Sequence, residues 1–595
     1  MMKRFPDLEN QQAILAFAHS EAVGYLKRML PSGYVLPTLT FTMAAVHGVE
    51  HDGFSASLNS GQAIITAPKA RGVLYGVYAL LEKLGCRFTF PRPQMEVVPG
   101  LERLPDIEAF TESPVMQCRG LCLYGLNREA LAETLMTVDW MAKNRYNFLL
   151  ASEKRECDAV QGFNGVLYGE VRDEVTPELQ KRGIVLDMSE HSTDCFFSRK
   201  DLYPKHPEWF ALCNGKRIPY QMCYANEEAT DYYAAQYAAY AAAHPEMQML
   251  GVWPLDGGFY CQCEQCKNPS TVARAVAKVA RAVHAVRPDL VVEHLAYTPQ
   301  SYPIPDFEME PNMCVLVCAK TDGIAQDWAR HMEKNQGAYY FEYNTADNYR
   351  WRANVWIQPD YCRWIVGRMA SMNYMGMVSL FLPIQSWWIA AVNYAFLRRA
   401  YWDVTFDRDT ALTELCAELF GTGAEAGKAA FELMLDQVQR RELWQRFPHA
   451  DLDGYEWESF DQRNASLDAA RASKVRSGVQ SALGILTHMD KSQLTAAQEL
   501  HLRCFTAYIH IVGLCHQWVD GFDGGCDEWQ GRLEPLFDYL EQLQKELGPV
   551  FITPEYARWR LIGRDNVFVK PKPETAVDVD KLLQEAAIKA AEQEN

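Results

Sequence analysis

Carboxylate residues stand at the ends of several short apolar segments of this sequence. Asp256 follows the apolar residues 249–253, and Glu342 closes the apolar run that begins near residue 338. Cleavage of a glycosidic bond needs one carboxyl group to protonate the leaving oxygen and a second to act as base or nucleophile. Aromatic rings nearby would bind the C–H faces of a sugar. The sequence therefore predicts Asp256 as general acid and Glu342 as base or nucleophile.

Polar and aromatic residues near the same segments complete the predicted sugar site. Asp187 and Glu293 add carboxylates from two other apolar segments, and Glu293 shares its strand parity with Tyr297, so both are expected on one side of a strand. The sequence contains neither GxxxxGK(S/T) nor GxGxxG, so no nucleotide cofactor is expected. The residues predicted to contact substrate are Arg119, His191, Asn226, Tyr297, Trp351, Trp387 and Trp388.

Several of these residues also have a structural explanation. An Asp that precedes two glycines, as Asp256 does, often bonds to the backbone of a turn. Glu342 lies in an apolar segment, where an unpaired carboxylate would be costly to bury. It is therefore either paired, with Arg350 or Arg352 as candidate partners, or exposed at a site. His191 lies in a loop, where a substrate contact and a structural role are equally compatible with its position.

Three cysteines within six residues form the sharpest cysteine signal of the chain. Cys261, Cys263 and Cys266 could bind Zn²⁺ together with a distant fourth ligand such as Cys223. They could equally be reduced packing thiols, or form a disulfide in an exported protein. Because a second CxxC partner is missing, the sequence assigns no metal ligand, and the expected cofactor content is none.

Eight strand-like segments separated by helices would position these candidates. Alternation of strands with crossover helices implies a parallel sheet, and eight repeats over about 290 residues fit a closed (β/α)8 barrel. Active sites of such barrels lie at the carboxyl ends of the strands. The strands are predicted at about 116–122, 147–151, 184–188, 249–253, 291–296, 314–318, 338–343 and 377–382, with helices at 128–143, 227–243, 271–286 and 359–372 among those between them.

Two further units flank the predicted barrel, which occupies residues 113–405. Residues 1–112 are predicted to form a small N-terminal α/β domain, with a strand at 63–66 and a helix at 72–82. Residues 406–595 are predicted to form a C-terminal α-helical domain. The fold class is therefore α/β, a TIM barrel between these two domains. The C-terminal helical segments are expected at 408–442, 461–488, 492–522 and 526–547, followed by a stiff linker at 570–573 and a last helix.

Composition narrows the partners of the chain. Among 595 residues, 58 are Lys or Arg and 76 are Asp or Glu, and the net charge of −18 argues against a nucleic acid partner. The uncharged run 370–397 is long enough for a membrane span, but polar residues and a proline interrupt it, so a buried strand and helix are predicted instead. The N-terminus lacks the apolar core of a secretory signal, which predicts a cytoplasmic protein unless a signal has been removed.

Several segments resemble known families. Residues 63–99 look like the accessory N-terminal domain of bacterial α-glucuronidases and β-hexosaminidases, at Gly72–Tyr78, Leu84–Phe88 and Val97–Pro99. Arg119-Gly120 and Trp140–Asn147 resemble the opening of the barrel that follows this domain. A bacterial family of barrel glycosidases, related to endo-β-N-acetylglucosaminidases that release N-glycans, is similar at His206–Leu212, Gly215–Arg217, Cys223–Asn226 and Asp256–Cys266.

The resemblance covers about residues 60–405 and implies a glycoside hydrolase acting on a glycan that contains N-acetylhexosamine or uronic acid. Substrate-assisted hexosaminidases carry two adjacent acidic residues after the fourth strand, whereas Leu255 and Gly257 flank Asp256 here. A separated pair such as Asp256 with Glu342 is therefore expected, with an oligosaccharide as the partner. Two alternatives stay open: a non-catalytic carbohydrate-binding protein on a glycosidase-derived scaffold, and a protein that binds metal through its clustered thiols.

Overall fold

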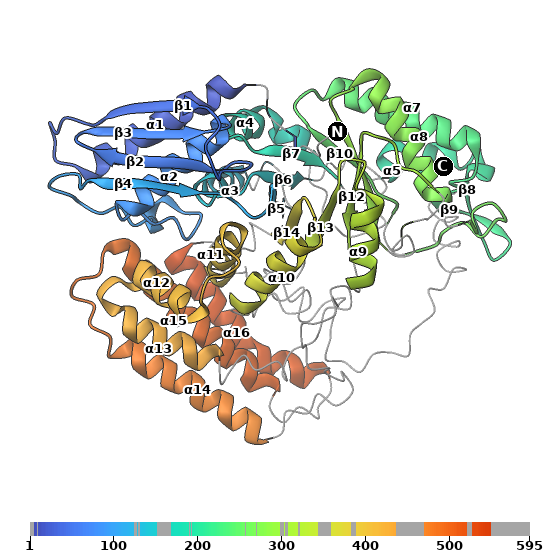
Figure 1. Cartoon of the computed structure of the whole chain (residues 1–595). Coiled ribbons are helices and arrows are strands. Elements are labelled where there is room, and N and C mark those ends of the chain that lie inside the picture. Colours follow the sequence, from blue (N-terminus) through green and yellow to red (C-terminus); the bar gives the residue numbers. More distant parts are fainter. Residues whose placement is uncertain are drawn as a thin grey trace.

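The computed structural model contains a closed eight-stranded barrel, with an N-terminal sheet and a group of C-terminal helices beside it (Figure 1). The residues that the structure describes are 5–6, 8, 10–123, 128, 131–151, 168–189, 191, 193–255, 258–268, 270–297, 303, 307–318, 322–342, 359–381, 388–435, 469–519 and 526–548.

The barrel is parallel throughout and closes where its last strand, β14, pairs with its first, β5. Every predicted barrel strand is present, within two residues of its expected ends, and the predicted TIM-barrel fold class is confirmed. The strands are β5 (Cys118–Leu123), β6 (Phe148–Ala151), β7 (Val185–Met188), β10 (Met249–Val252), β11 (Val291–Ala296), β12 (Met313–Val317), β13 (Ala338–Glu342) and β14 (Gly376–Phe381).

Helices cover the outside of the barrel and pack on the outward-facing strand residues. In α8 (Thr271–Val286), for example, Val272, Val276, Val279 and Val283 are buried, which is the spacing of one helical face. The other covering helices are α3 (Leu131–Lys143), α4 (Tyr168–Lys181), α7 (Glu227–Ala243), α9 (Asp322–His331), α10 (Pro359–Ser371) and α11 (Trp388–Trp402).

A β-hairpin interrupts the alternation between β7 and α7 and was not predicted. Its strands, β8 (Phe210–Cys213) and β9 (Lys216–Met222), pair antiparallel around Asn214 and Gly215, which have φ values of 49° and 79°. An Asn-Gly turn with two positive φ angles matches the twist of a tight hairpin. This dipeptide was the signal in the sequence that identifies the hairpin. Short helices precede it at Thr193–Phe196 (α5), Arg199–Leu202 (α6) and Pro207–Trp209 (η2).

The N-terminal domain is a four-stranded sheet of order β1-β3-β2-β4 with α1 (Gln11–Met29) and α2 (Ala70–Lys83) packed on it. The sequence predicted β3 and α2 only. No residue of the edge strands β1 and β4 is buried, so the alternation of apolar and polar residues that marks a half-buried strand is missing from them. The strands are β1 (Thr38–Met43), β2 (Phe54–Asn59), β3 (Gln62–Ala67) and β4 (Ile107–Glu112), and a short helix, η1 (Pro93–Met95), lies between α2 and β4.

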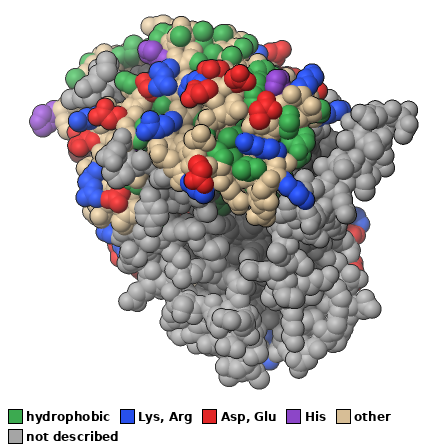
Figure 2. Space-filling view, turned by 90° about the vertical axis from the view of Figure 1, so that its right-hand side faces the viewer, with side chains coloured by type: hydrophobic (Ala, Val, Ile, Leu, Met, Phe, Trp, Pro, Cys, Tyr) green, Lys and Arg blue, Asp and Glu red, His purple; other side chains and the backbone are tan. Residues whose placement is uncertain are grey.

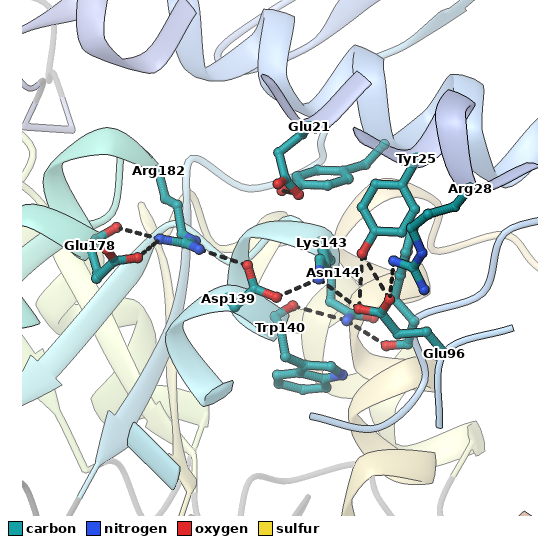
Figure 3. Close-up of polar contacts among 12 residues, drawn as sticks. Glu21, Tyr25, Arg28, Glu96, Asp139, Trp140, Lys143, Asn144, Glu178 and Arg182 are labelled. Carbon is teal, nitrogen blue, oxygen red and sulfur yellow. Dashed lines mark hydrogen bonds and ion pairs between the residues drawn. The ribbon is translucent and has the colours of Figure 1, made fainter. Parts of the chain in front are cut away.

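Largely buried ion pairs join the N-terminal domain to the outer helices of the barrel (Figure 3). Glu96 accepts a hydrogen bond of 2.9 Å from the Tyr25 hydroxyl and pairs with the Lys143 ammonium at 2.6 Å. Lys143, on α3, also pairs with Asp139, which binds the Arg182 guanidinium at 2.7 Å. The chain of alternating charges connects α1 to α3 and to the end of α4, and it fixes how the domain sits on the barrel.

The described C-terminal residues are almost entirely helical, as predicted. They pack beside α10 and α11 at one side of the barrel (Figure 1). The predicted linker at 570–573 and the helix after it lie outside the described residues. The helices are α12 (Arg408–Phe420), η4 (Gly421–Gly423), α13 (Ala424–Leu433), α14 (Ala469–Thr487), α15 (Ala496–Val519) and α16 (Cys526–Leu547).

Neither a membrane span nor a nucleic acid partner was predicted, and the features that concern these two predictions are the helices and the surface of the described residues. None of the helices in the described ranges has both the length and the apolar character that crossing a bilayer requires. Figure 2 shows the side of the molecule that carries α7, α8 and the β8–β9 hairpin. On the described part of that side, Lys and Arg side chains lie among Asp and Glu side chains.

Candidate functional site

Two carboxylate residues face the interior of the barrel. Residues alternate between the two sides of a strand, and Val185 and Leu295 belong to the core inside the barrel. Asp187 lies two residues after Val185 on β7, and Glu293 lies two residues before Leu295 on β11, so both carboxylate side chains point into the barrel. Both are completely buried. The strand between them, β10, places Gly251 opposite Glu293.

The absence of a side chain at Gly251 leaves room for Ser189 and Trp253, which bind the two carboxyl groups. A Cβ atom at this position would lie 2.2 Å from the Ser189 Oγ and 2.8 Å from the Trp253 Nε1. Contacts that short do not occur, so a side chain at position 251 would displace two groups that bind the carboxylates. The glycine is therefore part of the site's construction, although it supplies no functional group.

The two inward-facing carboxyl groups both have raised pKa values. The Ser189 hydroxyl donates to Asp187 at 2.5 Å, and the Trp253 indole Nε1 donates to Glu293 at 2.8 Å. Burial raises the pKa of Asp187 to about 7, against the opposing effect of its hydrogen bonds with Ser189 and Glu293. Burial and the neighbouring Asp187 charge raise the pKa of Glu293 well above its ordinary value. At neutral pH the pair therefore retains a proton that two separate carboxylates would have lost.

An aromatic group lies above the carboxyl pair, at the carboxyl ends of β7, β10 and β11. The His191 ring lies 5.3 Å from the Trp253 ring and 6.2 Å from the Tyr297 ring. His191 Nδ1 lies 2.6 Å from the Pro254 carbonyl oxygen, which can only accept, so Nδ1 carries a hydrogen. The structure thus brings two of the predicted substrate contacts, His191 and Tyr297, to one place. Trp253 joins them and in turn holds Glu293.

Glu342 lies on the other side of the barrel wall. It is the last residue of β13, is completely buried, and accepts hydrogen bonds from the Tyr361 hydroxyl at 2.8 Å and from the Ser379 hydroxyl at 2.7 Å. Tyr361 belongs to α10, on the outside of the barrel, whereas Phe341 belongs to the inner core. Of the two alternatives drawn from the sequence, the structure supports the paired one. The partners described are hydroxyl groups of α10 and β14.

Arg119 does not lie at the carboxyl ends of the strands, which corrects its predicted role. It is the second residue of β5, has 0% of its surface exposed, and pairs with Asp52 of the N-terminal domain at 2.7 Å. Arg71 pairs with the other oxygen of Asp52 at 2.9 Å, and Asn147 donates to the same carboxylate at 2.8 Å. Arg119 therefore joins the N-terminal domain to the amino end of the barrel and is inaccessible to a sugar.

Trp388 and Asn226 also have structural roles. The Trp388 side chain is completely buried, donates from Nε1 to His501 Nδ1 at 2.9 Å, and stacks on Phe431 of the C-terminal helices. It is therefore not a platform for a sugar, which corrects that prediction. Asn226 is the N-cap of α7, where its side-chain oxygen accepts from the Ala229 amide at 2.9 Å.

Asp256, Trp351 and Trp387 lie outside the described residues, so their predicted roles stay predictions. The residues on either side of positions 256–257 are nevertheless fixed. The Gln221 amide donates to the Leu255 carbonyl at 2.5 Å and to the Gly258 carbonyl at 3.2 Å. Gln221 thus holds both ends of the segment that carries Asp256.

Among the described residues, one group is spaced to hold a metal ion. It consists of Cys223, Cys261, Cys263 and Cys266, beside the β8–β9 hairpin and apart from the inward-facing barrel residues.

The sequence identified Asp187 and Glu293 as candidate carboxylates but did not predict a catalytic role for either. The signal that could have selected them is strand parity, because each shares its face with core residues of the barrel interior.

The fold of this chain is similar to that of several solved structures, and part of its sequence matches a family model. Residues 90–354 match the model of a family described as a domain of unknown function, DUF4838. No curated protein sequence matches the chain. A family GH115 4-O-methyl-α-glucuronidase with specificity for decorated arabinogalactans is similar in structure, with a TM-score of 0.62 at 9% identity over 93% of this chain and 78% of that one.

Two further solved structures are similar over most of both chains. A GH89 protein from Clostridium perfringens, in complex with its substrate GlcNAc-α-1,4-galactose, has a TM-score of 0.55 at 13% identity, over 92% of this chain and 68% of that one. A GH138 enzyme targeting pectin rhamnogalacturonan II has a TM-score of 0.51 at 12% identity, over 92% and 75%. At these identities the similarity establishes the shared fold and nothing finer.

Proposed function

We propose that the chain is a glycoside hydrolase that cleaves a glycosidic bond in a glycan containing N-acetylhexosamine or uronic acid. The observation that carries the proposal is the buried pair Asp187 and Glu293, whose pKa values burial raises, beneath the rings of His191, Trp253 and Tyr297. Carboxyl groups with raised pKa values below an aromatic surface are suited to proton transfer on a sugar. The similar structures described above carry glycosidase names, which supports the same reaction class.

We keep Asp256 as general acid, because in the sequence it comes soon after the fourth barrel strand, β10, and after Trp253, which binds Glu293. For the second carboxyl role, the sequence favoured Glu342. Its geometry does not support that role, since both carboxylate oxygens accept hydrogen bonds on the helix side of the wall. Asp187 faces inward and has a pKa of about 7, raised by burial. We therefore favour Asp187, paired with Glu293, as the group that exchanges a proton with the reaction site.

A second candidate function is carbohydrate binding without turnover. The observation in its favour is that Asp187 and Glu293 both have no exposed surface. A carboxyl group that substrate cannot reach stabilises the site but does not act on a bond. In this case the half-exposed His191 and Tyr297 would contact the sugar, and the buried pair would only hold the Trp253 indole in place.

A hydrolysis screen distinguishes these functions. The wild-type chain is incubated with a panel of processed N-glycans, other hexosamine-containing oligosaccharides and uronic-acid oligosaccharides, and products are read by mass spectrometry. Asp256→Asn, Asp187→Asn and Glu342→Gln are tested on any glycan that is cleaved, with Asp289→Asn, an exposed residue, as the control. We expect losses of about 10²–10⁴-fold for Asp256→Asn, the range for removal of a general acid.

Each outcome of the screen decides between the proposals. If Asp187→Asn lowers turnover and Glu342→Gln retains it in a folded protein, the inward pair has the second role. If Glu342→Gln alone abolishes turnover, the assignment drawn from the sequence replaces ours. Glycan binding without any cleavage by the wild-type chain would refute the hydrolase proposal and support the binding function.

A further inference from the structure

Four cysteine side chains converge beside the β8–β9 hairpin. Cys223 follows β9, whereas Cys261, Cys263 and Cys266 come from the segment after β10, about forty residues later. Their sulfur atoms all lie within 4.8 Å of one another. We propose that these four thiolates bind one Zn²⁺ ion, which fixes the hairpin to the segment that follows barrel strand β10.

The sulfur–sulfur distances fit a tetrahedral zinc site. With Zn–S bonds of about 2.3 Å, the corners of a tetrahedron lie about 3.8 Å apart. The Cys223 Sγ lies 3.6 Å from that of Cys261, 3.9 Å from that of Cys263 and 3.8 Å from that of Cys266. A disulfide would require about 2.05 Å between two sulfurs, and none of these three pairs is near that distance. Four soft sulfur ligands in a tetrahedron favour zinc among the common divalent ions.

Hydrogen-bond donors surround the cluster, as thiolate ligands require. The Leu212 backbone amide donates to the Cys261 Sγ at 3.3 Å, and the Arg217 guanidinium lies 3.9 Å from the same sulfur. Four thiolates around one divalent ion carry a net charge of −2, which the arginine partly offsets. Donors of this kind orient the ligands and stabilise their charged form.

The apolar core between the hairpin and the segment after β10 is small. Of the five buried residues in its core, three are cysteines, and the other two are Ala211 and Ile218. Small units of this size usually need disulfides or a structural metal. Cys223 and Cys261 are buried, and Cys263 and Cys266 are half-buried, so the site lies near the surface, within reach of an ion.

The site has a consequence for the barrel, although the zinc proposal does not depend on the glycosidase proposal. Gln221, two residues before Cys223, holds the carbonyls of Leu255 and Gly258. Cys261 follows Gly258 by three residues. An ion bound here would therefore stabilise the segment on both sides of Asp256 from the outside of the barrel.

Elemental analysis tests the proposal on the full chain. The protein is purified without chelator, and its zinc content is measured by mass spectrometry of the elements. We expect about one zinc ion per chain. Cys263→Ser and Cys266→Ser, chosen because their side chains are half-buried, should each lower the zinc content at least about tenfold. Cys213→Ser is the matched control, because Cys213 is buried in the same small core but lies outside the cluster, and it should keep its zinc.

A chelator experiment on the wild-type protein keeps the test independent of folding in the variants. Zinc release to a colorimetric dye should be accompanied by faster proteolysis within residues 210–266, and added Zn²⁺ should restore resistance. Cys195 is disulfide-bonded, so the chain can contain oxidised cysteines. Free thiols are therefore counted in parallel by mass spectrometry under denaturing conditions, which shows whether the four cluster cysteines are reduced. Disulfides among the four cysteines, four free thiols without metal, or iron in place of zinc would each overturn the proposal.

Discussion

Replacing Asp187 with Asn should change how the stability of the protein depends on pH. Asn keeps an oxygen that accepts from the Ser189 hydroxyl and offers an N–H group to Glu293, but it cannot lose a proton at neutral pH. The pKa of Asp187 is about 7 in the folded protein because of burial, against an ordinary value of 3.8. A carboxyl group whose pKa is raised in the folded state lowers the free energy of unfolding at pH values where it is ionised in the unfolded chain.

The sign follows from where the proton is bound. Between about pH 4 and pH 7, the folded state keeps the Asp187 proton and the unfolded chain has lost it, so stability falls as pH rises. The slope is about 1.4 kcal/mol per pH unit, and over about three units the total is about 4 kcal/mol. Asp187→Asn removes this contribution. Relative to wild type, the variant should therefore gain up to about 4 kcal/mol between pH 4 and pH 8, with little further change above that.

Urea unfolding followed by tryptophan fluorescence at pH 4.5, 5.5, 6.5 and 7.5 measures this difference. The control is Asp289→Asn. Asp289 is 60% exposed and paired with Arg287, and hydrogen bonding to that arginine lowers the pKa of the carboxyl group. Its contribution should be small and of the opposite sign, because a surface pair contributes about 0–1 kcal/mol. A stability difference between Asp187→Asn and wild type that stays constant from pH 4.5 to 7.5 would refute the assignment of a proton to the buried pair.

Three further substitutions test the surroundings of the site. Asp52→Asn leaves two buried guanidinium groups without their carboxylate and should cost about 3–5 kcal/mol in urea unfolding, whereas a cost below about 1 kcal/mol would contradict the buried pairing. Gly251→Ala should cost about 1–3 kcal/mol through its clash with Ser189 and should weaken glycan binding; an unchanged unfolding midpoint would show that the strand has room. Trp388→Ala should cost about 3–5 kcal/mol by leaving a cavity beside His501, and a folded variant with normal stability but lost glycan binding would restore its predicted role at the sugar site.

Strand positions in the barrel could be predicted closely because each is a short apolar run bounded by turns and followed by a helix. Such runs are buried on both faces, and this is typical of parallel sheets. The edge strands β1 and β4 could not be predicted, since none of their residues is buried. The helix α1 had a readable pattern, with Ile14, Ala18, Ala22 and Tyr25 on one buried face, yet it was missed.

The site was harder to predict because side-chain direction depends on the register of each strand. Glu342 was correctly placed at the end of a barrel strand, but adjacent residues face opposite sides, and Phe341 rather than Glu342 faces the interior. Arg119 was predicted as a polar contact of the substrate. Its partner, Asp52, is sixty-seven residues away in another domain, and no local pattern in the sequence identifies that pair.

Contacts from three directions converge on the segment after β10. Glu293 binds the Trp253 indole from inside the barrel, and Gln221 binds the backbone on both sides of Asp256. The cluster that includes Cys261 anchors the continuation of the segment to the hairpin. A catalytic carboxyl group must be held within a fraction of an ångström of its working position, and precision of that kind comes from the residues around it. These buried polar contacts on both sides of one loop are the physical reason for proposing Asp256 as the general acid.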